Sequence, residues 1–140
     1  MFAGLLVLWV IDGRTKKEQV LHTLFSVGVV WMVTLIIKDL YPISRPFMAL
    51  PGMTPMTVTI PVDASFPSTH TAVVFALGTT VFMHDKRVGF YFFMGAVLVA
   101  IGRILANVHY PSDIIAGALI GVLISWLGAK VHLFRFLSGS

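Results

Sequence analysis

The chain has 140 residues, of which 57% are apolar and only 11% are charged, and its formal net charge is +4. An average soluble domain has about 25% charged residues, so this composition excludes a disordered chain, a fibrous repeat and an ordinary soluble domain. Cysteine is absent, which excludes disulfides, thiolate zinc sites and cysteine nucleophiles. The length predicts one domain that spans residues 1–140.

Apolar residues gather into five segments along the chain, at residues 1–11, 20–37, 68–83, 88–107 and 112–134. A membrane-spanning helix needs about 20 residues, with a range of roughly 17 to 25. The second, fourth and fifth segments meet this length, and the third is marginal. The first would cover only about 16 Å and is typical of a helix whose beginning is missing. We therefore expect an all-α, polytopic transmembrane helical bundle that lacks an upstream helix.

Charged linkers at residues 12–19 and 84–87 are short, whereas the linker at residues 39–67 is long and holds six of the seven prolines. If the segments cross the membrane alternately, both short linkers and the C-terminal tail share one side, with seven of the ten basic residues. Basic residues collect on the cytoplasmic side. The pattern predicts a multi-pass cell-membrane protein whose long linker faces outward, and it explains the positive charge without a nucleic-acid partner.

The residues best suited to chemistry fall on the outward side, in three separate stretches: Lys38, Arg45, His70, Arg103, His109 and Asp113. Lysine and arginine side chains bind phosphate oxygens, and a histidine beside a phosphate can act as nucleophile or proton donor. Asp113 follows His109 by four residues, so its carboxylate can orient the imidazole. Acids on this side are too few for a two-metal site. The set predicts phosphoryl transfer without a metal.

Two helix starts are expected at the same place, which adds to a phosphate site. Ser68 is a good N-cap for the third segment, and Pro111 and Ser112 suit the first turn of the fifth. Helix N-termini present free N–H groups that favour phosphate.

These residues form three motifs that resemble those of the type 2 phosphatidic acid phosphatase superfamily, which also includes the vanadium haloperoxidases. The K-x6-R-P motif is complete from Lys38 to Pro46. The P-S-G-H motif stands as PSTH at residues 67–70, with Thr69 in place of glycine. The S-R-x5-H-x3-D motif occupies residues 102–113, with Gly102 in place of serine. Neither departure removes a catalytic group.

The resemblance implies a role for each motif residue. His109 would attack phosphorus and carry a phosphohistidine, Asp113 would orient His109, and His70 would protonate the leaving oxygen. The phosphate oxygens would be held by Lys38, Arg45, Arg103, Ser68 and Thr69. The implied enzyme is a membrane lipid phosphatase with no cofactor and no metal. Its expected substrate is undecaprenyl diphosphate, recycled to the monophosphate for cell-wall synthesis at the outer membrane face.

Other interpretations stay open. Phosphatidylglycerophosphate, phosphatidic acid and diacylglycerol diphosphate are rival substrates. A non-catalytic membrane subunit that binds an anionic headgroup would need only the cations, so the presence of His70, His109 and Asp113 argues against it. A vanadate-dependent peroxidase is disfavoured because those relatives are soluble. Asp63 in the long linker is expected to be solvated, and Gly117 and Gly121 are expected to make ordinary small-residue packing.

Overall fold

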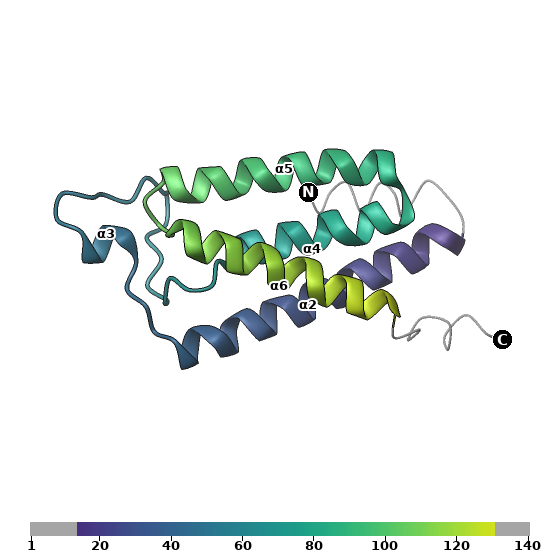
Figure 1. The fold of residues 1–140 in the computed structure, drawn as a ribbon, viewed down its shortest axis with the longest axis horizontal. Coiled ribbons are helices and arrows are strands. Elements are labelled where there is room, and N and C mark those ends of the chain that lie inside the picture. The colour runs from purple at the N-terminus through teal and green to yellow at the C-terminus, as the bar shows by residue number, and fades with distance from the viewer. Residues whose placement is uncertain (1–13, 131–140) are drawn as a thin grey trace.

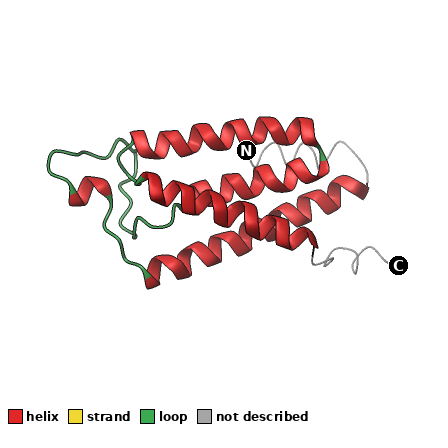
Figure 2. Ribbon diagram, in the orientation of Figure 1, coloured by secondary structure: helices red, strands yellow, loops and turns green. Residues whose placement is uncertain are grey.

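The computed structural model describes residues 14–130, and this part of the chain consists of helices and loops without a strand (Figure 2). The helices are α2 (Arg14–Leu40), α3 (Pro46–Ala49), α4 (Thr69–His84), α5 (Lys86–Leu105) and α6 (Pro111–Lys130). The all-α prediction is confirmed for this range. The apolar segment at residues 1–11 lies outside the described residues.

The helix boundaries follow the apolar segments closely, with one clear difference. Residues 12–19 were predicted to form a linker, but α2 already begins at Arg14. Residues 14–19 read RTKKEQ, and arginine, lysine, glutamate and glutamine are good helix formers. The turn between α4 and α5 shrinks to Asp85, whose carboxylate accepts hydrogen bonds from the N–H groups of Arg87 (2.8 Å) and Val88 (3.1 Å) and so caps α5.

Three of the described helices are long and apolar enough to cross a membrane: Val20–Leu40, Lys86–Leu105 and Pro111–Lys130. These three spans correspond to the second, fourth and fifth of the five apolar segments, the ones that met the length of a membrane span. Large apolar side chains stand exposed on all three helices, among them Trp31, Ile36, Phe90, Leu98, Leu119 and Leu123. Exposed apolar surface on this scale is typical of helices that face lipid.

Helix α4 lies at the centre of the bundle and packs against α2, α5 and α6, while α2 and α6 also contact each other (Figure 1). Its inward residues Ala72, Ala76, Leu77 and Val81 are fully buried, and Val30 of α2 joins the cluster formed by the two alanines. Because α4 is surrounded on several sides by other helices, it needs less apolar surface than a lipid-facing helix. Its 16 residues include several threonines, of which Thr71, Thr79 and Thr80 are buried.

Helix α6 approaches α4 so closely that only glycine fits at two positions. A Cβ atom at Gly117 would lie 2.6 Å from the Ser68 carbonyl oxygen, and one at Gly121 would lie 2.2 Å from the Ala72 carbonyl oxygen. The expectation of ordinary small-residue packing was therefore too weak, because here the two backbones touch. Close approach through small residues spaced four apart is a common way to pair membrane helices. The contact holds the start of α4 against the first turns of α6.

Candidate active site

The motif residues meet at one end of the bundle, where α2 and α5 end and α4 and α6 begin (Figure 1). Lys38 lies in the last turn of α2 and Arg103 in the last turn of α5. Asp113 lies in the first turn of α6, and His70 is the second residue of α4. Arg45 immediately precedes α3, and His109 lies in the turn between α5 and α6.

The centre of the site is a buried pair formed by His109 and Asp113. His109 Nδ1 lies 3.3 Å from Asp113 Oδ2. The same carboxylate oxygen accepts hydrogen bonds from the Ser65 hydroxyl (2.6 Å) and the Tyr110 backbone N–H (2.9 Å). With a carboxylate beside Nδ1, the neutral imidazole carries its proton there, so Nε2 is the nitrogen with the lone pair. This arrangement suits Nε2 to act as a nucleophile.

Arg45 lies directly beside that atom. Its Nη1 is 3.2 Å from His109 Nε2 and donates a hydrogen bond to the Val108 carbonyl oxygen at 2.8 Å. Nη1 donates to Nε2 here, so a phosphate that bound this guanidinium would lie next to the lone pair of the imidazole. Proximity of this kind is the geometry that attack on phosphorus requires.

The surroundings of His109 keep its imidazole uncharged. Burial is the largest influence and lowers the pKa of His109, the hydrogen bond with Asp113 raises it, and the positive charges of Arg45 and Arg103 lower it again. The net result is a pKa below the usual histidine value. At neutral pH the ring is therefore the neutral form, which a nitrogen nucleophile must be.

Asp63 bridges two of the cations, and the prediction that it is merely solvated was wrong. Its Oδ2 lies 3.0 Å from Lys38 Nζ and its Oδ1 lies 2.7 Å from Arg45 Nη2. Lys38 also donates to the Ala64 carbonyl oxygen. Burial raises the pKa of Asp63, but hydrogen bonds from Lys38 and Arg45 outweigh it and hold the pKa below the usual range. Asp63 is therefore an ionised part of the site.

Arg103 and Thr69 contribute buried donors without partners. Within residues 14–130, Arg103 Nε and Thr69 Oγ1 are buried and make no hydrogen bond. Such orphaned donors are rare in proteins and call for a ligand or water. The Ser68 oxygen instead caps α4, because it accepts hydrogen bonds from the Thr71 N–H (3.4 Å) and hydroxyl (3.0 Å).

His70 lies at the exposed rim of the site. The positive charge of Arg103 acts on its ring, as do Arg45 and His109. His70 thus stands within electrostatic reach of both the proposed nucleophile and the cations. Within the described range, no group of three metal-binding side chains is found.

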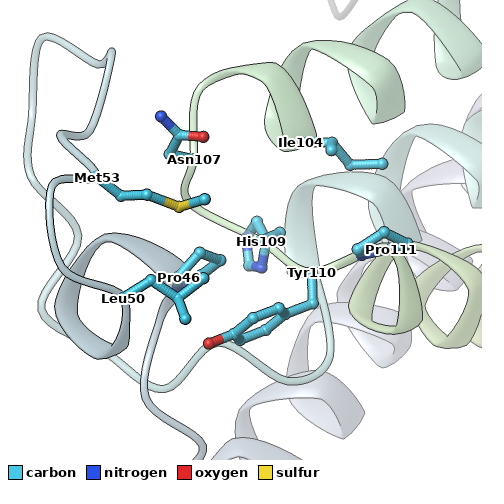
Figure 3. Close-up of a pocket in the computed structure, with 8 residues that line it drawn as sticks. All are labelled: Pro46, Leu50, Met53, Ile104, Asn107, His109, Tyr110 and Pro111. Carbon is cyan, nitrogen blue, oxygen red and sulfur yellow. The ribbon is translucent and has the colours of Figure 1, made fainter.

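A cavity of about 140 Å³ opens beside the His109 ring. Figure 3 shows His109 in its middle, with Leu50 and Met53 on the loop side and Ile104 and Pro111 on the helix side. The remaining lining residues are Pro46, Asn107 and Tyr110. Most of this lining is apolar, so the His109 ring borders both the cluster of cations and an apolar pocket.

Comparison with known proteins assigns the family. Residues 19–137 match the model of the PAP2 superfamily. The chain belongs to this superfamily. The resemblance drawn from the three motifs is thereby confirmed, since PAP2 denotes the type 2 phosphatidic acid phosphatases.

Individual relatives of this PAP2 chain come from several bacteria. It is 33% identical over 132 residues to the bacitracin transport permease protein BcrC of Bacillus licheniformis, covering 91% of this chain and 64% of that protein. It is 26% identical to the undecaprenyl-diphosphatase BcrC of Bacillus subtilis, covering 94% and 65%. The crystal structure of Aquifex aeolicus LpxE superposes with a TM-score of 0.79 at 27% identity, covering 92% and 75%. The chain thus spans just under two thirds of the two BcrC proteins.

Parts of the site are not conserved letters of the PAP2 motifs and were not foreseen. Ser65 and the Tyr110 backbone N–H hold Asp113, as described above. Asn107 adopts a left-handed conformation (φ 59°) after α5, and its side chain donates to the Thr54 carbonyl oxygen at 3.0 Å. Asparagine tolerates this conformation and often ends helices, so its place before the histidine was a usable signal. This contact ties the long loop to the turn that carries His109.

Proposed function

We propose that this chain is a metal-independent membrane lipid phosphatase that hydrolyses undecaprenyl diphosphate to the monophosphate through a phosphohistidine at His109. The observation that carries the proposal is the buried His109–Asp113 pair with Arg45 beside the imidazole Nε2. A protein that only bound anionic headgroups would need the cations but not an oriented imidazole.

In the first step, Lys38, Arg45 and Arg103 hold the terminal phosphate with its phosphorus facing His109 Nε2. The imidazole lone pair forms the N–P bond while the bond between phosphorus and the leaving oxygen breaks. His70 donates a proton to that oxygen, which leaves as the lipid monophosphate. Asp113 stabilises the positive charge that develops on the ring, as the aspartate does in a serine-protease triad.

In the second step, water attacks the phosphohistidine. His70, now unprotonated, accepts a proton from the water, the N–P bond breaks, and orthophosphate leaves. Both steps build negative charge on the phosphate oxygens, and preorganised cations in a water-poor site stabilise such charge strongly. Two arginine forks and one lysine thus fill the role that metal ions play in other phosphoryl-transfer enzymes.

Two observations support a lipid diphosphate as substrate. One relative is named an undecaprenyl-diphosphatase, and it aligns with 94% of this chain. The cavity beside His109 has about 140 Å³, whereas sites that enclose a whole ligand measure roughly 300–1,000 Å³. It accepts only the end of the lipid next to the phosphates, and the rest of the chain would lie along the exposed apolar helices.

Phosphate release by the purified protein in detergent tests this function. We expect release from undecaprenyl diphosphate that survives excess EDTA and that vanadate inhibits, because the vanadate adduct mimics the transition state and such mimics bind tightly. Phosphatidylglycerophosphate and phosphatidic acid serve as rival substrates in the same panel, and the His109→Ala protein is the blank. Loss of activity in EDTA with rescue by magnesium would contradict the mechanism, and faster cleavage of a rival would reassign the substrate.

We propose in addition that the site faces the extracytoplasmic side of the cell membrane, on the basis of the seven-to-three division of basic residues. Because the chain has no cysteine, single cysteines report topology cleanly. In intact cells, an impermeant maleimide should label Thr54→Cys, in the exposed loop at the site end, and should leave Thr15→Cys unlabelled until the cells are opened. The opposite pattern would place the site in the cytoplasm.

A further inference from the structure

Every donor group of Arg45 is already occupied. Its Nε donates to the Asp63 carbonyl oxygen (2.9 Å), and its Nη2 donates to Asp63 Oδ1 (2.7 Å) and the Ala64 carbonyl oxygen (3.4 Å). Its Nη1 contacts the Val108 carbonyl oxygen and His109 Nε2. An arriving phosphate must therefore replace at least one of these partners before it can bind Arg45.

Two of the three donors of the Lys38 ammonium are engaged as well, by Asp63 Oδ2 and the Ala64 carbonyl oxygen. The Asp63 carboxylate thus places one oxygen on each cation, as two oxygens of a phosphate would. The cations are buried, with side chains 5% and 3% exposed, whereas the Asp63 side chain is 51% exposed. The Asp63 side chain can therefore rotate away from the cations into solvent, while the backbone carbonyl oxygens keep both cations in place.

We propose that Asp63 determines anion specificity: it is a built-in competitor that occupies Lys38 and Arg45 in the empty site and gives way only to a terminal phosphate. This inference rests on the proposed function of the site. A terminal phosphate carries about −1.5 to −2 charges at neutral pH and offers three free oxygens. It therefore gains more from the two cations than the single negative charge of Asp63 does.

The same comparison of charges predicts that the commonest anions at a membrane surface, the phosphodiesters of phospholipids, do not displace Asp63 from the cations. The phosphodiester of a phospholipid headgroup carries one negative charge and two free oxygens, like the carboxylate it would have to replace. Displacing Asp63 gives such a group no electrostatic advantage. Without Asp63, three site cations would face a surface crowded with phosphodiesters, and the site would fill with lipids that it cannot cleave.

Orthophosphate binding tests the proposal without turnover. Titration calorimetry at pH 8, where orthophosphate is a dianion, compares the wild type with Asp63→Asn and Asp63→Ala in dodecyl maltoside micelles, with and without phosphatidylglycerol. The matched control is Asp39→Asn, which removes the same charge from an exposed residue at the same end of the bundle. Thermal melting in the same micelles checks that each variant is folded.

We expect the Asp63 variants to bind orthophosphate roughly 3- to 30-fold more tightly than wild type in plain micelles, as the loss of two competing ion pairs would give. Phosphatidylglycerol should weaken that binding several-fold in the Asp63 variants but leave the wild type and Asp39→Asn unchanged. Weaker binding by the Asp63 variants would make Asp63 a positioning residue and overturn the proposal. Competition by phosphatidylglycerol in the wild type would overturn it too, even if no Asp63 variant folds. Intact binding without hydrolysis would count against the proposed function alone.

Discussion

Replacement of His109 by alanine should remove turnover altogether and with it the phosphoenzyme. His109 Nε2 is the atom that Arg45 and Asp113 leave poised for attack, and alanine offers no nucleophile in its place. Loss of a nucleophile that works within a catalytic unit typically costs about 10⁶-fold in kcat. The measurement is a rapid quench with substrate labelled in its terminal phosphate, which should trap an acid-labile, base-stable label on the wild type and none on His109→Ala.

The His70→Ala variant tests the role of the second histidine and is compared with His109→Ala. If His70 donates the leaving-group proton, its loss should slow phosphoenzyme formation by about 10²- to 10⁴-fold, the usual contribution of a general acid. The deficit should shrink with a substrate whose leaving group needs no proton. Label retained on His109→Ala but absent from His70→Ala, with such a leaving group, would exchange the roles of the two histidines.

Replacement of Asp113 by asparagine should reduce kcat by up to ~10⁴-fold, by analogy with the serine-protease aspartate, and should change KM little. Asp113 Oδ2 accepts hydrogen bonds from Ser65 and Tyr110 and lies beside His109 Nδ1. An amide at this place cannot stabilise the charge that forms on the imidazole ring, and it can select the wrong tautomer. Steady-state kinetics with undecaprenyl diphosphate separate kcat from KM, and calorimetry with orthophosphate should show binding retained.

Ser65→Ala is a milder change at the Asp113 carboxylate and serves as a control for Asp113→Asn. It removes one of the hydrogen bonds that hold Asp113 but leaves its charge, so we expect a loss of about tenfold, in line with a hydrogen bond to a charged group. A loss from Ser65→Ala as large as that from Asp113→Asn would mean that the carboxylate acts through its position and not through its charge. An effect of Asp113→Asn on KM alone would assign it to substrate binding.

The sequence predicted those features of the site that depend on spacing along helices. Arg103 and Asp113 lie on either side of the short turn that carries His109, and Lys38 and His70 lie at ends of helices that the apolar segments delimit. Once the segments alternate in direction, these residues must share one end of the bundle. The lengths of the apolar segments and the spacing of the motif residues are strong signals. Both the helices and the meeting of the motif residues at one end of the bundle could therefore be predicted.

The contribution of the long loop could not be predicted in the same way. Asp63 and Ser65 lie in an irregular stretch, where neither hydrophobic period nor helix spacing indicates the direction of a side chain. Asp63 was interpreted as solvated because it is an acid in a loop, and only the folded loop places it between Lys38 and Arg45. The direct backbone contact at Gly117 and Gly121 was underestimated for a related reason, because two glycines four residues apart do not reveal which helix they touch.

The short length of α4 has a consequence for how the reactants arrive. Its 16 residues rise about 24 Å, less than the roughly 30 Å hydrocarbon core of a bilayer. Lys38, Arg103 and Asp113 likewise lie within the apolar helices rather than beyond their ends. If these helices span a bilayer, the candidate site would lie below the level of the membrane surface. Under the proposed function, water and released orthophosphate would pass the loop at residues 39–67, whereas the lipid tail of the substrate would enter from the side of the bilayer, so the two reactants would reach phosphorus from different phases.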